Sequence, residues 1–125
     1  MVKLIGNYKI NCAVFISGRG TNLKSIYEYS KIKKSNISLK LVISNKSKTL
    51  GIDFARKYKI KTQVVRYKNK NEAEKKIIKC LKKNNIKLIC LAGFMKILSK
   101  NFIKRFKYNI INIHPSLLPK YKGLK

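Results

Sequence analysis

The fold is decided by the stretch Ile10-Asn-Cys-Ala-Val-Phe-Ile-Ser-Gly-Arg-Gly-Thr-Asn-Leu23. Its first half, Ile10–Ser17, is an apolar, β-branched run that ends at Gly18, which is the pattern of a strand buried on both faces. Thr21 or Asn22 can cap a helix that follows, because such side chains accept hydrogen bonds from the first free N–H groups of a helix. A buried strand that leads through glycines into a helix is typical of an α/β domain.

The rest of the chain repeats this alternation of short apolar runs and longer amphipathic segments. We expect further strands at Leu39–Ser44, Lys61–Val65, Leu88–Leu91 and Ile110–Ile113. We expect further helices from Thr49 to Tyr58 (Ile52, Ala55 and Tyr58 inward), over Asn71–Asn84 (Ala73, Ile77, Ile78 and Leu81 inward), and after a Ser99 cap (with Phe102, Ile103 and Phe106). The alternation predicts a Rossmann-like α/β fold, a parallel sheet of about five strands in the order 3-2-1-4-5 with helices on both faces.

The length of the chain allows one domain. Its 125 residues can bury one core but not two, so residues 1–125 are interpreted as a single domain. No apolar run is long enough to span a bilayer, and Cys12–Ile16 is too short for the core of a signal peptide. The three cysteines, Cys12, Cys80 and Cys90, form no C-x-x-C pair. We therefore expect buried thiols rather than a metal site, and a location in the reducing cytoplasm.

The chain is strongly basic, with 31 Lys and Arg against 4 Asp and Glu and a net charge of +27. Taken alone, this charge favours a nucleic acid or an anionic surface as partner. However, 27 of the basic residues are Lys, and Asn (12 copies) and Ile (18 copies) are also frequent; codons rich in A and T produce such a composition. The lysines are spread over every segment without an aromatic RNA-binding signature. We interpret them as solvated faces and expect no specific nucleic-acid binding.

A candidate phosphate loop, Ser17-Gly-Arg-Gly-Thr-Asn-Leu23, joins the first predicted strand to the first predicted helix. Glycines let the backbone approach a ligand, and the helix directs its free N–H groups to the same place. The loop lacks the Gly-Lys-Ser/Thr ending of a Walker loop. It also lacks the third glycine and the acid after the second strand that a dinucleotide site needs. A monophosphate site and an ordinary helix cap remain as interpretations.

A second candidate site lies at the end of the last predicted strand. Asn112 and His114 are two residues apart, so their side chains can share one side. His114, the only histidine in the sequence, can exchange a proton near neutral pH. The amide of Asn112 can donate a hydrogen bond to a developing oxyanion. The pair suits acyl transfer to an amine, and a structural histidine in the turn before Pro115 is the alternative.

A third candidate is the segment Leu91–Leu98, after the fourth predicted strand. It offers apolar groups and a glycine that suit a flat heteroaromatic ring, with core packing as the alternative for Ile97 and Leu98. Ligands of parallel sheets bind beyond the carboxyl ends of the strands. We therefore expect all three candidate sites to open on one crevice.

Three segments resemble glycinamide ribonucleotide formyltransferases, in the same order along the chain. They are Ile16–Leu23, Leu91–Ser99 and Ile111–Tyr121, and the resemblance runs from about Asn11 to Leu124. It implies the transfer of a formyl group from 10-formyltetrahydrofolate to the amine of glycinamide ribonucleotide in purine synthesis, without a metal.

The resemblance also implies roles for residues at the three candidate sites. The implied binders of the ribonucleotide are Gly20, Thr21 and Asn22. The implied folate contacts are Met95, Lys96, Ile97, Leu98 and Asn112. The implied catalytic residues are His114, as proton donor, and Asn112, as oxyanion stabiliser.

Two departures from the family pattern affect these expectations. Asn71 stands where the family has an Arg that contacts the folate. The family also continues past Gly123 with further strands and a catalytic Asp, whereas this sequence stops at Lys125. Its acids, all on predicted helices, offer no substitute: Glu28, Asp53, Glu72 and Glu74. We therefore expect a truncated N-terminal domain with impaired catalysis. As a protein partner we expect either a second copy of the chain, in a homodimer, or a complementing C-terminal fragment.

The sequence leaves four further functions open. Two are enzymatic, those of a methionyl-tRNA formyltransferase and of a formyltetrahydrofolate deformylase, which share the Asn-x-His element but not the phosphate loop. Two are not enzymatic, namely a basic nucleic-acid-binding remnant and a non-catalytic subunit that pairs with another chain through a sheet edge.

Overall fold

The structure is a computed structural model that describes residues 8–113. Within this range strands and helices alternate along the chain. Their bounds are β1 (Ile10–Ile16), α1 (Thr21–Ser30), β2 (Ile37–Ser44), α2 (Leu50–Lys57), β3 (Thr62–Val64), α3 (Lys70–Lys83), β4 (Leu88–Leu91), α4 (Lys100–Phe106) and β5 (Asn109–Asn112). None of the helices in this range is long and apolar enough to cross a membrane.

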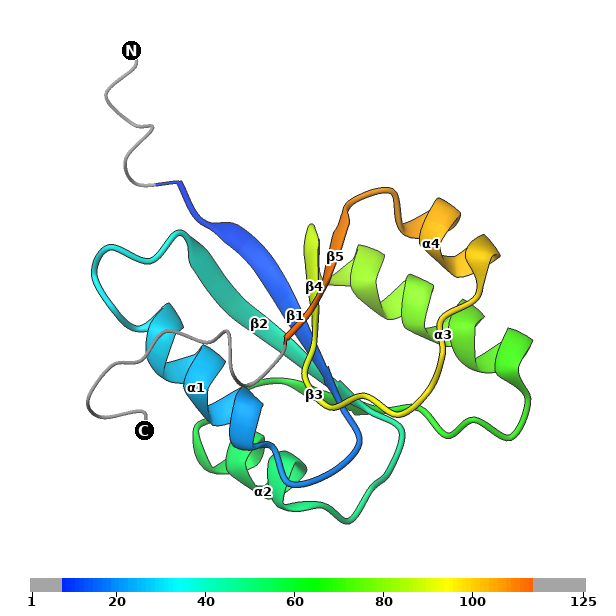
Figure 1. Ribbon diagram of the computed structural model, residues 1–125, viewed down its shortest axis with the longest axis horizontal. Coiled ribbons are helices and arrows are strands. Elements are labelled where there is room, and N and C mark those ends of the chain that lie inside the picture. Colours follow the sequence, from blue (N-terminus) through cyan, green and yellow to red (C-terminus); the bar gives the residue numbers. More distant parts are fainter. Residues whose placement is uncertain (1–7, 114–125) are drawn as a thin grey trace.

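The five strands form one parallel sheet in the order β3-β2-β1-β4-β5. Helices α1 and α2 lie on one face of the sheet and helices α3 and α4 on the other (Figure 1). The predicted fold class and strand order are confirmed. The order places β1 beside β4, so the loops that follow these two strands are neighbours at the carboxyl edge of the sheet.

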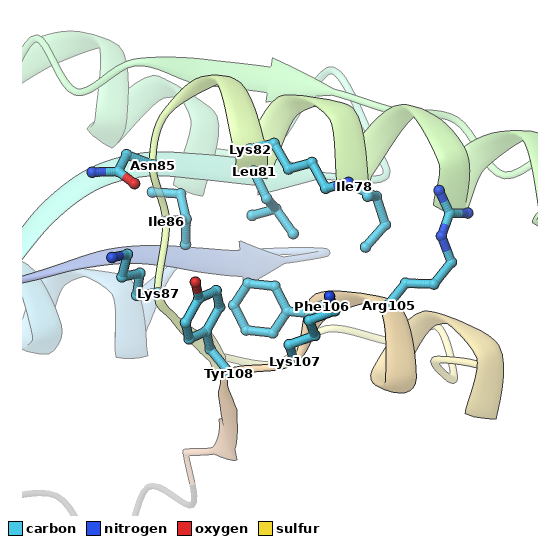
Figure 2. Close-up of a pocket in the computed structure, with 10 residues that line it drawn as sticks. All are labelled: Ile78, Leu81, Lys82, Asn85, Ile86, Lys87, Arg105, Phe106, Lys107 and Tyr108. Atoms are coloured by element: carbon cyan, nitrogen blue, oxygen red, sulfur yellow. The ribbon is translucent and has the colours of Figure 1, made fainter.

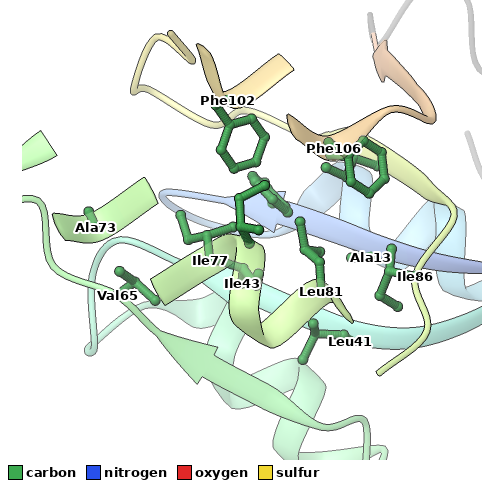
Figure 3. Packing of buried hydrophobic residues seen from close by; sticks show 13 residues of the cluster. Ala13, Leu41, Ile43, Val65, Ala73, Ile77, Leu81, Ile86, Phe102 and Phe106 are labelled. Carbon is green, nitrogen blue, oxygen red and sulfur yellow. The ribbon is translucent and has the colours of Figure 1, made fainter. Parts of the chain in front are cut away.

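The two faces of β1 contribute to two separate hydrophobic cores. Ala13 and Phe15 pack under α3 and α4, whereas Cys12, Val14 and Ile16 pack under α1 and α2. Figure 3 shows the first of these cores, where Phe102 and Phe106 of α4 meet Ile77 and Leu81 of α3 above the sheet. All five strand residues are fully buried. Burial on both faces is why the run is apolar throughout instead of alternating with polar residues.

Side-chain caps set the start of three helices. The hydroxyl of Thr49 accepts from the N–H of Ile52 at 3.1 Å, and that of Ser99 from the N–H of Phe102 at 3.0 Å. The cap predicted at Ser99 is therefore confirmed. Thr49, predicted as the first residue of its helix, is the residue that caps it. Helix α3 begins at Lys70, one residue earlier than predicted, because the side chain of Asn69 provides its cap.

Two local predictions are wrong. Thr21 and Asn22 do not cap α1; they lie in its first turn, and Gly20 occupies the capping position in a left-handed conformation. Tyr58 does not point inward but is 43% exposed, because α2 ends at Lys57 and Tyr58 follows it with non-helical backbone angles. Its ring packs instead against Phe54 and Tyr27, with centroids 4.7 and 5.0 Å away.

Candidate functional site

The carboxyl edge of the sheet brings three predicted segments together. Phe15 of β1 pairs with Leu91 of β4, and Leu91 pairs with Asn112 of β5. Adjacent strands are about 4.8 Å apart, so the backbone of Asn112 lies on the order of 10 Å from that of Phe15. The loop after β1, the loop after β4 and the end of β5 therefore share one edge, as the crevice rule predicts.

A cavity of about 340 Å³ opens at this edge. Its lining consists of the loop after β1 with the first turn of α1 (Ser17, Gly18, Arg19, Gly20, Thr21, Asn22), one residue after β2 (Lys46), and the segment after β4 (Ala92, Gly93, Met95). The structure thus gathers the predicted Gly20, Thr21, Asn22 and Met95 around one space. Lys96, Ile97, Leu98 and Asn112 are not part of this lining.

Gly20 is required by both conformation and space. Its φ is +81°, and a Cβ there would lie 2.6 Å from the Cα of Gly51 in α2. The N–H of Gly51 in turn donates to the carbonyl of Gly18 at 3.2 Å. The loop after β1 is therefore packed against the first turn of α2, a contact that two glycines make possible.

The N-terminus of α1 is suited to an anion. No side chain among residues 8–113 caps it, and its first turn contains no acidic residue. The free N–H groups and the positive end of the helix dipole thus remain available to a ligand. Arg19 and Lys46 line the same cavity, so two full positive charges add to that of the helix end. A phosphate fits these groups best.

A buried hydroxyl connects the three loops at this edge. Ser17 is 4% exposed; its hydroxyl donates to the Oδ1 of Asn45, after β2, and accepts from the N–H of Met95, after β4, at 2.8 Å. The sequence patterns placed Ser17 in the candidate phosphate loop without a role of its own, and they did not predict Asn45 or Lys46 as site residues. The available signal was their position, since each is a polar residue at or just after the end of a predicted strand.

The segment after β4 presents its side chains in two ways. Met95 and Ile97 are 76% and 80% exposed, and Lys96 is also exposed. Leu98 is partly buried against the core under α3 and α4. Core packing is therefore correct for Leu98 and wrong for Ile97. Met95 and Ile97 provide the apolar surface that the sequence led us to expect.

The far end of this segment is anchored to α3. Glu74, 5% exposed, accepts from the N–H of Ser99 at 2.9 Å and from its hydroxyl. Nearby, the Nζ of Lys96 lies 5.6 Å from the ring centroid of Tyr67. Burial, with the negative charge of Glu74, raises the pKa of Tyr67 to about 12. The segment is thus held at Met95 by Ser17 and at Ser99 by Glu74.

The remaining predicted residues are placed as follows. Asn112 is exposed at the end of β5. His114 lies outside the described residues. Asn71 is exposed in the first turn of α3 and does not line the cavity. Among residues 8–113 no three His, Cys, Asp or Glu side chains are close enough together to hold a metal ion.

A comparison with known protein families identifies the family of this chain. Residues 10–125 match the formyl transferase family, which is nearly the whole chain. The chain belongs to this family. The formyl transferase match covers β1, the phosphate loop and the segment after β4, and thus every group that lines the cavity at the carboxyl edge.

Individual formyl transferase relatives agree with this assignment. The chain is 42% identical over 118 residues to the trifunctional purine biosynthetic protein adenosine-3 of Gallus gallus, with 92% of this chain and 12% of that protein aligned. It is 42% identical over 115 residues to the phosphoribosylglycinamide formyltransferase of Haemophilus influenzae, with 90% of this chain and 54% of that protein aligned.

A solved structure shows the same fold. The phosphoribosylglycinamide formyltransferase of Brucella melitensis superposes with a TM-score of 0.81 at 34% identity, over 93% of this chain and 62% of that one. The chain thus spans about half the length of the relative from Haemophilus influenzae and a small part of the trifunctional one.

Proposed function

We propose that this chain provides the ribonucleotide-binding and part of the folate-binding side of a glycinamide ribonucleotide formyltransferase. The observation that carries the proposal is the single cavity lined both by the uncapped N-terminus of α1 and by the segment after β4. Two substrates that exchange a group must meet within one space, and this cavity has an anion-binding side and an apolar side. The relatives named above support the choice of substrates.

The phosphate of glycinamide ribonucleotide would lie at Gly20, Thr21 and Asn22. The left-handed Gly20 turns the chain so that the free N–H groups of α1 open on the cavity. Arg19 and Lys46, which line the same cavity, contribute positive charge. A dianionic phosphate gains from each of these groups, because both the helix end and the cations favour negative charge.

The folate, 10-formyltetrahydrofolate, would lie against the segment after β4. Met95 and Ile97 expose apolar surface. Lys96, Asn112 and the part of Leu98 that the core leaves exposed complete the set that we assign to the folate. Gly93, with φ +76°, has open space around the position of its absent Cβ within the described residues. A flat ring can therefore approach the backbone there.

Asn112 and His114 would carry the chemistry. The amine of glycinamide ribonucleotide attacks the formyl carbon, a C–N bond forms, and the bond from that carbon to the folate nitrogen breaks. The amide of Asn112 would donate a hydrogen bond to the oxyanion of the tetrahedral intermediate. His114 would transfer the proton that the amine loses to the departing folate nitrogen.

Calorimetric titration of the full chain with glycinamide ribonucleotide tests the anion side. We expect saturable binding that Asn22→Asp weakens by more than about tenfold, since a carboxylate in the first turn of α1 repels the phosphate. Lys24→Gln is the matched control; Lys24 is on the same helix but is not part of the cavity lining. The proposal would be contradicted if only Lys24→Gln lost binding, or if the wild-type chain did not bind glycinamide ribonucleotide at all.

A formyl-transfer assay with both substrates tests the reaction. We expect formylated product to depend on His114, so that His114→Ala abolishes turnover while ribonucleotide binding persists. Transfer to methionyl-tRNA would instead favour a methionyl-tRNA formyltransferase, and release of formate without an acceptor would favour a formyltetrahydrofolate deformylase.

A further inference from the structure

A second cavity, of about 260 Å³, lies at the opposite edge of the sheet. It opens between the C-terminal ends of α3 and α4 (Figure 2). Among its lining residues, Lys87 directly precedes β4 and Tyr108 directly precedes β5. Each of these strands has four residues, so the cavity is on the order of 13 Å from the formyl-transfer edge. It is therefore separate from the site proposed above.

The inner wall of this cavity is apolar and aromatic. Figure 2 shows the rings of Phe106 and Tyr108 side by side below the side chains of Leu81 and Ile86. The centroids of the Phe106 and Tyr108 rings are 5.5 Å apart, and the ring planes form an angle of 72°. Phe106 is 5% exposed, whereas Tyr108 is 50% exposed. Tyr108 thus offers ring surface to a ligand, and Phe106 fixes its position from behind.

The rim of the cavity is cationic. Four of its lining residues carry a positive charge, namely Lys82, Lys87, Arg105 and Lys107, and within the described residues the lining contains no Asp or Glu. Two helix C-termini also face this region and together contribute about one negative charge. Four full charges exceed that sum, which leaves a net charge of about +3 at the rim. Two other cavities along α3 include Glu72, and one of them shares Lys82 and Arg105 with this cavity.

Two hydrogen bonds with Asn11 hold the wall on the β4 side in place. The side chain of Asn11 donates to the carbonyl of Asn85 at 3.1 Å, and the N–H of Lys87 donates to the carbonyl of Asn11 at 2.9 Å. The Nζ of Lys87 lies 5.7 Å from the ring centroid of Tyr108. Charge and ring are therefore already adjacent before a ligand arrives, which lowers the cost of ordering them on binding.

A lysine closes the wall on the α4 side in an unfavourable conformation. Lys107 ends α4 with φ +70°, where glycine is the usual residue because a side chain there costs about 1–2 kcal/mol. Lys107 thus places a positive charge at the rim of the cavity, although the backbone conformation at this position favours glycine.

We propose that this cavity binds a small anion carried on a flat ring, the chemical class of a nucleoside monophosphate. The ring lies against Tyr108, and the phosphate lies beside Arg105 and Lys107, on the α4 side of the cavity. The size of the cavity restricts the ligand to one nucleoside with one phosphate, partly exposed to solvent. Because the cavity is remote from the formyl-transfer edge, the proposal stands independently of the proposed function.

The test uses AMP as the probe and the full chain, titrated by calorimetry and by amide NMR at physiological ionic strength. We expect saturable binding with shifts confined to residues 81–87 and 105–108. Arg105→Gln and Tyr108→Leu should each weaken it by at least about fivefold. Lys104→Gln is the matched control, because Lys104 is exposed on the same helix but does not line the cavity; it should change the affinity less than about twofold. Thermal unfolding of each variant checks that it is folded.

Three further results would overturn the proposal. If Lys104→Gln weakens binding as much as Arg105→Gln does, the attraction comes from the general charge of the chain. If Asn22→Asp abolishes AMP binding while Arg105→Gln leaves it intact, the nucleotide binds at α1 instead. If ribose phosphate binds as tightly as AMP, the ring contributes nothing and the ligand class is wrong. Weaker binding of both ribose phosphate and adenosine than of AMP supports the proposal.

Discussion

At the residue scale, the two glycines of the phosphate loop have different roles. Gly20 has φ +81° and abuts the backbone of Gly51, whereas a Cβ at Gly18 would meet no atom of the described residues within 4 Å. Both look alike in the sequence Ser-Gly-Arg-Gly. Their difference comes from α2, which the chain reaches some thirty residues later.

Gly20→Ala should therefore lower the free energy of unfolding by about 2–4 kcal/mol, from left-handed strain together with the contact with Gly51. Gly18→Ala is the matched control and should stay within about 1 kcal/mol of wild type, because alanine also restricts the unfolded chain. Urea denaturation measures both changes. Equal losses in the two variants would show that the packing of Gly20 against α2 is unimportant.

Tyr67 provides a second prediction at this scale, on pH dependence. Its hydroxyl is buried without a hydrogen-bond partner among residues 8–113, and its pKa is raised from 10 to about 12. The folded state therefore holds this proton more tightly than the unfolded state. The contribution of this proton to the free energy of unfolding is fully present below pH 10 and is lost as the pH rises towards 12. Partial exposure reduces its size to about 1 kcal/mol.

In Tyr67→Phe this loss should disappear. At neutral pH the variant should match or exceed wild type in stability, because it removes a buried hydroxyl that lacks a partner. Denaturation of both proteins at neutral pH and near pH 11 isolates the difference from the titration of the many lysines. A variant that is clearly less stable at neutral pH would indicate that the hydroxyl has a partner after all.

At the element scale, α3 supports the connection between β4 and α4 through Glu74 and Ser99. Ser99 in turn caps α4. Glu74→Ala removes both acceptors and leaves the N–H of Ser99 unpaired, so it should cost about 2–4 kcal/mol. It should also speed amide exchange from Lys96 to Phe102.

Glu72→Ala is the matched control for Glu74. Glu72 is exposed in the first turn of α3, and its loss should cost about 0.3–1 kcal/mol through the helix dipole. Amide exchange in the segment from Lys96 to Phe102 should stay as in wild type. Equal exchange in both variants would show that Glu74 does not anchor the segment.

Burial determines which of the three thiols reacts first. Cys12 and Cys90 lie on the adjacent strands β1 and β4, with their sulfurs 3.5 Å apart. The hydrogen bond with Cys90, together with burial, raises the pKa of Cys12. Cys80, on α3, is only partly buried. In the native chain Cys80 should therefore react first with a thiol reagent.

Cys80→Ser should leave a folded protein whose thiols react only as fast as it unfolds. The rate of modification, followed at several urea concentrations, tests this. Rapid reaction of two thiols in native Cys80→Ser would contradict the buried position of the pair.

At the scale of the whole molecule, charge dominates. A net charge of +27 on 125 residues repels itself in the compact state, and salt screens this repulsion. The melting temperature should therefore rise by several degrees, about 5 °C, between about 10 mM and about 500 mM sodium chloride. Choline chloride at equal ionic strength is the control and should give the same rise.

A flat or falling melting temperature would show that the lysines are too well solvated to matter. A larger rise in phosphate than in chloride at equal ionic strength would instead indicate a specific anion site. Asn22→Asp and Arg105→Gln then distinguish the two cavities that we assign to anions.

The sequence by itself determined the elements and their order. β1 was recognisable from an apolar run ending at glycine, and α3 from apolar residues at helical spacing; both patterns lie within one short segment. Three motifs could likewise be assigned to one edge of the sheet, namely the phosphate loop, the segment after β4 and the end of β5. This assignment was possible because parallel strands present their carboxyl ends together. Only tertiary structure decided that Ser17 joins Asn45 and Met95, and that Glu74 holds Ser99. These contacts link residues 28, 78 and 25 positions apart, and no local pattern encodes a partner at that distance. Tyr58 shows the same limit, since its exposure depends on where α2 ends relative to the sheet.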